Sequence, residues 1–407
     1  MIPRVRPSYA WSDFRAAFFA KNNAVVAFEQ ELAAHFGLKH AIAFPYGRSA
    51  LYAALKALNR PAGEVLQPAY NCVVVAHATV CAGYRPVFVD TQPNDPNQNP
   101  EAMLQQVNRN TAVVIPTSIF GVPFDASTLF REIRNRNPEA LVIVDYCQAF
   151  DATWPGTAIQ EQGDAVLLAF GIGKPMTTLF GGALLTDRED IHKTVRGYRD
   201  ATFQTPSRTQ IIGRWGYFLA SWIALSDRMV GFTDWMEHAE TPLRRYLLSL
   251  RSRESIVLPA DNTTLMMSTE AGIGRSQLRR VGQFLNRRRE IAQRYADGLQ
   301  GLPDLELLCW PNGSSYAIYA VRVRHAEDRT RILTALRRKG IQGDTVLNYV
   351  VPALGCYAQL GYSGEAYPHA ADWSARIINF PNHPTMTDAQ VTHVIHALRS
   401  ALGAGQG

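Results

Sequence analysis

Cysteine is scarce in this chain, which has five in 407 residues and no pair with CxxC spacing. A low, odd count excludes a disulfide framework and a cysteine zinc site, and it indicates reduced, buried thiols. The N-terminus has no uninterrupted apolar segment of the signal-peptide type. The most apolar later stretch, 215–225, is well short of the roughly 20 residues that cross a bilayer. We therefore expect a cytoplasmic protein.

Net charge is also low. Lys and Arg number 41 against 35 Asp and Glu, a formal net charge of +6. So small an excess gives little reason to expect a nucleic-acid partner, which usually needs a clustered basic patch. Hydrophobic residues make up 47% of the chain, a globular composition that excludes a disordered protein. The length predicts about two or three domains.

Short apolar strands alternate with helices in the first half of the chain. The strands are predicted at AIAFPYG, which ends in a turn, and at EVLQPAY, RPVFVD, TAVVIPTSIFG, LVIV, DAVLLAF and GALLTD. This alternation predicts an α/β fold with a mostly parallel sheet and helices on both faces. We place a large α/β domain at 1–267, with a helical insertion near 205–262, and a small α+β domain at 268–407. The small domain begins with a predicted helix over 268–299. Its basic face is a solvated face or an anion-binding or partner surface, and it consists of Arg279, Arg280, Arg287, Arg288 and Arg289.

A lysine lies in a glycine-rich segment between two predicted strands. Lys174 follows Gly171 and Gly173 and precedes the pair Gly181–Gly182. Glycines let a backbone approach a ligand closely, and a lysine amine kept neutral there can form a Schiff base. Taken alone, the segment also fits a surface lysine in a turn.

Two further segments suit a phosphorylated cofactor. Asp145 ends the strand LVIV, and open α/β sheets bind ligands at the carboxyl ends of their strands. Pyridoxal phosphate needs such a carboxylate at its ring nitrogen, and Gln148 could hydrogen-bond the same ligand. A glycine turn at Gly47 leads into a predicted helix whose first residues are Arg48 and Ser49. Free amides, a guanidinium and a hydroxyl there suit a phosphate. Taken alone, Asp145 also fits an ordinary turn or helix cap, and the Gly-Arg-Ser segment also fits an ordinary helix cap.

The order of these segments matches the layout of fold-type-I pyridoxal phosphate enzymes. Nearly the whole chain resembles the DegT/DnrJ/EryC1/StrS family of sugar aminotransferases. The resemblance is carried by FGLKHAIAFPYGRSALYAALKAL, EVLQPAYNCVVVAHATVCAGYRPVFVD, VIVDYCQAFDATWPG, LAFGIGKPMTTLFGGALLTD, MMSTEAGIGRSQLRRVGQFLNRRREIAQRYADGL and GYSGEAYPHAADWSARIINFPNHPTMTDAQVTHVIHAL. It implies a fold-type-I transferase with a mostly parallel, seven-stranded sheet.

The resemblance implies a role for each candidate residue. Lys174 would hold pyridoxal 5'-phosphate as a Schiff base and act as the catalytic acid and base. Asp145 would pair with the ring nitrogen, and Gln148 would lie near the ring hydroxyl. Residues 47–49 would line the phosphate site. Cys72 would stand where the family usually places an aromatic ring over the cofactor. No metal site is implied.

Four positions depart from the family's usual pattern. Ala169 replaces a serine five residues before the lysine, and Phe150 replaces a histidine two residues after the glutamine. Thr264 and Met266 stand where an Asn-x-Arg-Met-Ser segment usually supplies its asparagine and arginine. The chain therefore lacks some of the side chains that usually contact the cofactor phosphate in the family, and we expect Arg48 to compensate.

The implied function is transfer of an amino group from an amino acid, such as glutamate, to a keto-sugar that is nucleotide-linked. Such an enzyme would be a homodimer and would serve polysaccharide or antibiotic biosynthesis. A pyridoxal-phosphate-dependent dehydratase or lyase is one alternative, although the family's dehydratases usually carry histidine in place of the lysine. A non-catalytic regulatory or scaffold protein is the other.

The insertion has no counterpart in typical members of the family. Its apolar residues fall on one helical stripe: Trp215, Phe218, Leu219, Trp222, Ile223 and Met229. Three interpretations fit the stripe, namely a core or dimer helix, a lid over the active site, or a membrane-surface helix through 211–236.

Overall fold

The computed structural model describes residues 1–60, 63–226, 229–238 and 255–403. Its larger sheet has seven strands in the order β1-β7-β6-β5-β4-β2-β3. All neighbouring strands pair in parallel except β7, which runs antiparallel to both β1 and β6. The strands are β1 (His40–Phe44), β2 (Glu64–Pro68), β3 (Arg85–Val89), β4 (Thr111–Val114), β5 (Leu141–Asp145), β6 (Ala165–Ala169) and β7 (Gly182–Thr186). The predicted α/β class and seven-stranded sheet are confirmed.

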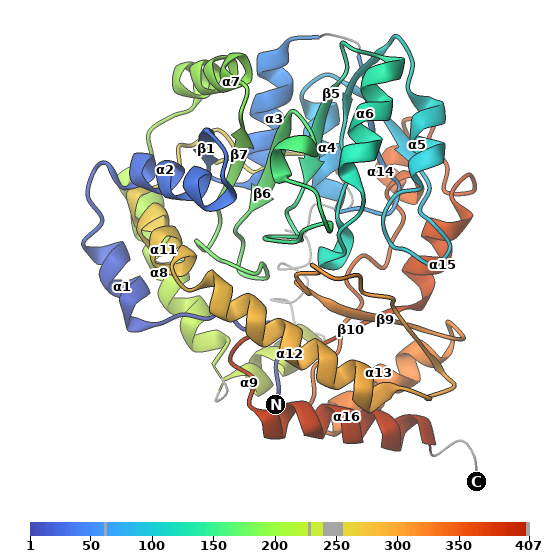
Figure 1. Cartoon of the computed structure of the whole chain (residues 1–407). Helices are drawn as coiled ribbons and strands as arrows, with labels where there is room; N and C mark the ends of the chain where they lie inside the picture. Colours follow the sequence, from blue (N-terminus) through green and yellow to red (C-terminus); the bar gives the residue numbers. More distant parts are fainter. Residues whose placement is uncertain (61–62, 227–228, 239–254, 404–407) are drawn as a thin grey trace.

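Helices cover both faces of this sheet (Figure 1). They are α2 (Ala24–Phe36), α3 (Gly47–Leu58), α4 (Val73–Cys81), α5 (Pro100–Gln106), α6 (Ala126–Arg136) and α7 (Glu189–Thr202), with short 3-10 turns η1 (Ile119–Gly121) and η2 (Ile159–Glu161). Most of these helices begin and end within a few residues of the sequence prediction. α2 stops at Gly37, whose φ of 65° is the left-handed conformation that glycine adopts at helix ends.

The middle strand, β5, is buried on both faces. Val142 and Val144 pack in a hydrophobic cluster with α2 and α6, whereas Leu141 and Ile143 pack in a second cluster with α3 and α7. Successive side chains of a strand point to opposite faces, so a strand covered on both sides is a continuous apolar run. This run delivers Asp145 to the carboxyl edge of the sheet.

The second half of the chain forms a smaller antiparallel sheet, seen in orange below the large sheet (Figure 1). Its order is β10-β9-β8, with β8 (Leu305–Leu307), β9 (Tyr319–Val323) and β10 (Ile377–Phe380). Around it lie α12 (Val281–Leu299), α13 (Asp328–Arg338), η3 (Val351–Ala353), α14 (Gly355–Ala358), α15 (Pro368–Arg376) and α16 (Asp388–Gly403). The boundary at 267/268 stays a prediction.

The single helix predicted over 268–299 is wrong. The chain forms α11 (Ser268–Leu278) and α12, which are separated at Arg279 and Arg280. The basic face is also not simply solvated, because Arg280 pairs with the buried Asp13 at 2.6 Å. Arg288 is buried and donates to backbone carbonyls of the small sheet region. These guanidiniums tie α11 and α12 to neighbouring segments of the same chain.

The insertion contains α8 (Arg208–Ala224) and α9 (Val230–His238). Ser207 begins α8 with a capping box, in which its hydroxyl accepts from the N–H of Gln210. α8 packs on α1 (Trp11–Phe18) through stacked rings of Phe14 and Phe218, 4.4 Å apart. The predicted stripe continues through residues 227 and 228, which lie outside the described residues. Over the described ranges, no helix is both long and apolar enough to span a membrane.

Candidate active site

A cavity of about 320 Å³ lies at the carboxyl edge of the large sheet. Its wall comes from the segments that follow β1, β2, β4, β5 and β6, and from α8. Six of the seven residues predicted from the sequence line it: Gly47, Arg48, Cys72, Asp145, Gln148 and Lys174. Parallel strands bring their carboxyl ends to one edge, so residues up to 127 positions apart (174 − 47) meet there.

The seventh predicted residue, Ser49, is not on the cavity wall. Its side chain is fully buried, and its hydroxyl donates to Oδ1 of Asn262 at 2.8 Å. The Nδ2 group of Asn262 is buried too, without a partner among the described residues. A phosphate contact through the Ser49 hydroxyl therefore stays a prediction.

Two glycines bring the start of α3 against the sheet. A Cβ atom on Gly182 would lie 2.3 Å from the backbone nitrogen of Gly47. A Cβ atom on Gly47 would in turn lie 2.8 Å from the Cβ of Ala169. Only glycine allows this approach of backbones. The first amides of α3, which have no acceptor within the helix, are thereby placed at the cavity, where they suit an anion.

Asp145 is 2% exposed and stands at the end of β5. Its Oδ1 accepts a hydrogen bond from the backbone N–H of Cys147 at 2.8 Å. Burial raises the pKa of this carboxyl, whereas that hydrogen bond and the charge of Lys174 lower it. A buried carboxylate with an oxygen facing a cavity suits a cationic group such as a protonated pyridine nitrogen.

Gln148 has a fixed amide orientation. Its Oε1 accepts from the backbone N–H of Phe120 at 2.9 Å, in a tight turn where Phe120 has a φ of 58°. The carbonyl end is thus occupied, so the amide Nε2 is the end that can donate to a ligand in the cavity. Asn71 also lines the cavity and donates to Thr117 Oγ1 at 3.0 Å. Asn71 is not among the residues predicted from the sequence, although it directly precedes Cys72.

Lys174 lies on a turn after β6, where its N–H donates to the carbonyl of Gly171 at 2.9 Å. It borders both this cavity and a second one of about 260 Å³. The same loop contains Leu179, which is buried and has a φ of 82°. A leucine in the left-handed region is strained, and strain of this kind persists where surrounding structure imposes it.

Two cysteines line the cavity. Cys72, at the N-terminus of α4, borders both cavities. Cys147, which follows β5, also lines the cavity and is not among the site residues predicted from the sequence. Burial raises the pKa of the Cys147 thiol well above its ordinary value, and the nearby Asp145 adds to this. The thiol is therefore protonated at neutral pH and is a poor nucleophile.

The insertion reaches the cavity through α8, in line with the lid interpretation, but through a residue that is not on the predicted stripe. Tyr217 lines the cavity beside Phe180, with ring centroids 4.8 Å apart. The guanidinium of Arg214 lies 3.7 Å from the centre of the Phe180 ring and donates to Tyr46 Oη at 2.9 Å. Arg214 also pairs with Asp261 at 2.6 Å. One arginine of the insertion thus holds two aromatic side chains of the wall, those of Tyr46 and Phe180.

Behind this arginine lies a buried carboxyl group. Glu270 Oε1 is 3.7 Å from Arg214 Nε and has no hydrogen-bond partner among the described residues. Burial raises the pKa of Glu270 to about 7, against the lowering effect of Arg214.

Arg48 is a cationic side chain on the cavity wall, in the first turn of α3. It is half-buried, and its guanidinium lies 5.5 Å from the Tyr46 ring centroid. Within the described part of the chain, no carboxylate pairs with it. An uncompensated cation beside the N-terminus of α3 suits an anionic ligand.

The positions that depart from the family pattern are found in three settings. Ala169 lines the cavity with a methyl group. Phe150 is buried against Phe36, with centroids 5.0 Å apart, and belongs to the core. Thr264 is buried outside the cavity wall, and Met266 is a core residue.

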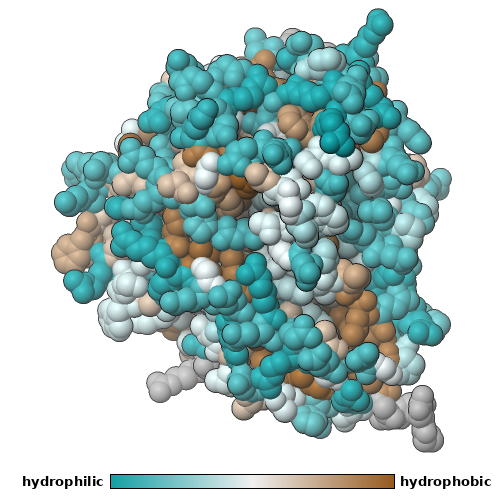
Figure 2. All heavy atoms as spheres, viewed as in Figure 1, coloured by the Kyte–Doolittle hydropathy of each residue, from teal (hydrophilic) through white to brown (hydrophobic). Residues whose placement is uncertain are grey.

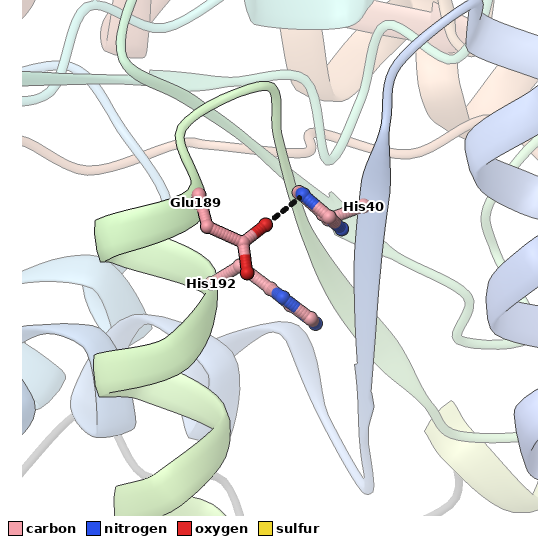
Figure 3. A group of neighbouring side chains, drawn as sticks. All are labelled: His40, Glu189 and His192. Carbon is pink, nitrogen blue, oxygen red and sulfur yellow. Dashed lines mark ion pairs between the residues drawn. The ribbon is translucent and has the colours of Figure 1, made fainter.

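A separate cluster lies where β1 begins and α7 begins (Figure 3). Glu189 pairs with His40 Nε2 at 2.8 Å, and the rings of His40 and His192 are stacked 4.1 Å apart with an interplanar angle of 4°. An imidazole binds a metal through a nitrogen lone pair in its ring plane. Two parallel stacked rings cannot direct those lone pairs at one ion, so as they lie these side chains do not form a metal site.

The seven-stranded sheet, with a buried aspartate at the end of β5 and a lysine after β6, defines a fold-type-I enzyme. The chain belongs to the DegT/DnrJ/EryC1/StrS aminotransferase family, whose family model matches residues 14–236 and 244–399. The predicted family and enzyme class are therefore confirmed.

Individual relatives are similar over nearly the full chain. The spore coat polysaccharide biosynthesis protein SpsC of Bacillus subtilis (strain 168) is 27% identical over 391 residues, covering 94% of this chain and 91% of SpsC. The PLP form of Spr1654, a putative sugar aminotransferase of Streptococcus pneumoniae, has a TM-score of 0.78 at 21% identity, with 100% of both chains covered. Helicobacter pylori PseC, an aminotransferase of pseudoaminic acid biosynthesis, has a TM-score of 0.79 at 17% identity, with 99% of both chains covered. The PLP form of Spr1654 agrees with the cofactor predicted here.

Proposed function

We propose that this protein uses pyridoxal 5'-phosphate to transfer an amino group from an amino acid, such as glutamate, to a nucleotide-linked keto-sugar. The observation that carries the proposal is the cavity in which Lys174, the buried Asp145 and the N-terminus of α3 face one another. The similarity to SpsC, Spr1654 and PseC supports sugars as the substrate class. Polysaccharide or antibiotic biosynthesis is the expected role.

The residues present fit this cofactor. The amides at the start of α3 and the guanidinium of Arg48 would hold its phosphate. Asp145 would keep its ring nitrogen protonated, and the free Nε2 end of Gln148 would donate to its ring hydroxyl. When bound, the cofactor supplies an electron sink for charge that develops at the reacting carbon.

Lys174 is the residue that moves protons. Its amine would hold the cofactor covalently and be released when an amino acid takes its place. The free amine would then take the proton from the α-carbon of the donor, and would return a proton to the former carbonyl carbon of the sugar in the second half of the reaction. Its position on the border of the two cavities supports both roles.

We also propose that the chain works as a homodimer. Large hydrophobic residues of α1 and its C-cap, α8 and α9 are exposed by 47% to 74%: Trp11, Phe18, Phe19, Ile212, Leu219, Ile223, Phe232 and Trp235. Hydrophobic residues are visible in the region of α1 on the left of the space-filling view (Figure 2). Exposed apolar surface of this extent is typical of interaction sites, and a twofold contact would cover it on both chains. A stable, active monomer in light scattering would contradict this, and binding to liposomes would favour the membrane interpretation.

All five cysteines are free, which supports a reducing compartment such as the cytoplasm.

The proposed chemistry is tested by spectroscopy and by assay. The purified protein should carry a cofactor absorption band that shifts on addition of glutamate. Borohydride reduction followed by mass spectrometry should find the cofactor on Lys174 rather than Lys56 or Lys193. Keto-sugar nucleotides are then screened in a glutamate-coupled assay. A protein that binds no cofactor would instead fit the non-catalytic alternative.

A further inference from the structure

The second cavity adjoins the first and has a volume of about 260 Å³. The two share three wall residues, which are Cys72, Gln148 and Lys174. The far wall comes from the small-sheet half of the chain, where Ile318 and Leu347 supply apolar surface. A ligand in this cavity therefore lies beside Lys174, which borders both cavities.

The N-terminal segment supplies part of this wall, and it is held in place. Ile2 bonds to residues 340 and 342 through its backbone, with N···O distances of 2.7 and 3.0 Å. The carbonyl of Pro3 accepts from His383 Nε2 at 3.1 Å. The N–H of Arg4 donates to Gln342 Oε1 at 3.0 Å. Residues 2–4 thus lie beside residues 340–342 like an added strand and present Arg4 to the cavity.

Only part of the Arg4 guanidinium is paired within the chain. Its Nε lies 2.9 Å from Asp344 Oδ2, and its side chain is 22% exposed. Among the described residues, Arg4 and Lys174 are the only charged side chains on the wall of this cavity. Because one edge of the guanidinium meets Asp344, the remaining N–H groups are available to a second carboxylate.

We propose that Arg4 binds the carboxylate of the amino-acid donor, an inference that rests on the proposed function. In an α-amino acid, the carboxylate is bonded to the same carbon as the reacting nitrogen. Its binding partner must therefore border the same small cavity as Lys174, as Arg4 does. The diphosphate of a nucleotide-linked sugar is several bonds farther from the keto carbon, so it would lie beyond this position. When the uncharged sugar ring replaces the donor, Asp344 still neutralises the guanidinium.

The test compares Arg4→Gln and Arg4→Lys with the wild-type holoenzyme. Glutarate, a dicarboxylate without an amino group, is titrated by calorimetry, and KM is measured for glutamate and for the keto-sugar. A charge-assisted hydrogen bond to a carboxylate predicts a 10- to 100-fold loss of glutarate affinity in Arg4→Gln, and a smaller loss in Arg4→Lys. The KM for glutamate should rise similarly, with an unchanged KM for the sugar and an unchanged cofactor spectrum.

Arg338→Gln is the matched control, because Arg338 is an exposed arginine at the end of α13. It should leave every one of these values unchanged. The inference is overturned if Arg4→Gln leaves glutarate affinity and the glutamate KM at wild-type values, or if only the KM for the sugar rises. If the protein binds no pyridoxal phosphate, the proposed function is overturned. If the holoenzyme is active and Arg4→Gln changes neither glutarate affinity nor the glutamate KM, this inference alone is overturned.

Discussion

Removing the guanidinium of Arg48 should weaken cofactor binding. Arg48 lines the cavity at the second position of α3, and in the described chain it has no carboxylate partner. Ala169 offers no hydroxyl, and the Ser49 hydroxyl donates to Asn262 and does not line the cavity. We therefore expect the helix amides and the Arg48 guanidinium to provide most of the phosphate binding.

The size of the effect follows from the contact that is lost. A hydrogen bond between charged groups contributes about 1.5–3 kcal/mol, and each 1.4 kcal/mol is a factor of about ten. Arg48→Ala should therefore raise the Kd for pyridoxal phosphate by about 10- to 100-fold. Arg48→Lys keeps the charge but loses the two-pronged geometry, so it should fall between wild type and Arg48→Ala.

The assay is a titration of the apoprotein with pyridoxal phosphate, followed by the cofactor absorption band. Arg109→Ala is the control, because Arg109 is an exposed arginine in the loop between α5 and β4. An unchanged Kd in Arg48→Ala, together with a raised KM for a substrate, would refute the reasoning. That result would assign Arg48 to substrate binding and not to cofactor binding.

Three further changes have expected outcomes. Lys174→Ala should abolish the cofactor band and turnover with an unchanged Tm, and a retained band would contradict its role. Gly182→Ala should lower Tm sharply because the new Cβ meets the backbone of Gly47, whereas Gly197→Ala, an open helical site, should not. Because burial raises the pKa of Glu270 to about 7, above its unfolded value, its carboxyl costs stability as pH rises from about 4.5 to 7. The Tm of Glu270→Gln should therefore rise relative to that of wild type between pH 5 and pH 8. If the Tm difference between the two proteins is the same at both pH values, the prediction is wrong.

The sequence by itself determined the sheet and the centre of the site. A parallel strand covered on both faces must be a continuous apolar run, so LVIV identified β5 and placed Asp145 at its end. Gly47 at the start of α3 and the pair Gly181–Gly182 are local signals of close backbone approach, whereas Gly171 and Gly173 have open space around them. The topology of an α/β sheet then brings strand ends together without any further information.

Only the tertiary structure decided which distant side chains complete the site. Arg4 and Lys174 are 170 positions apart (174 − 4), and no spacing predicts that an N-terminal segment will pair beside residue 341. Likewise, the stripe on α8 predicted an apolar contact, but the other face of the helix carries Tyr217 to the cavity. The direction of a side chain depends on what packs around its helix or turn, and those partners come from elsewhere in the chain. For the same reason, the hydroxyl of Ser49 faces Asn262 rather than the cavity.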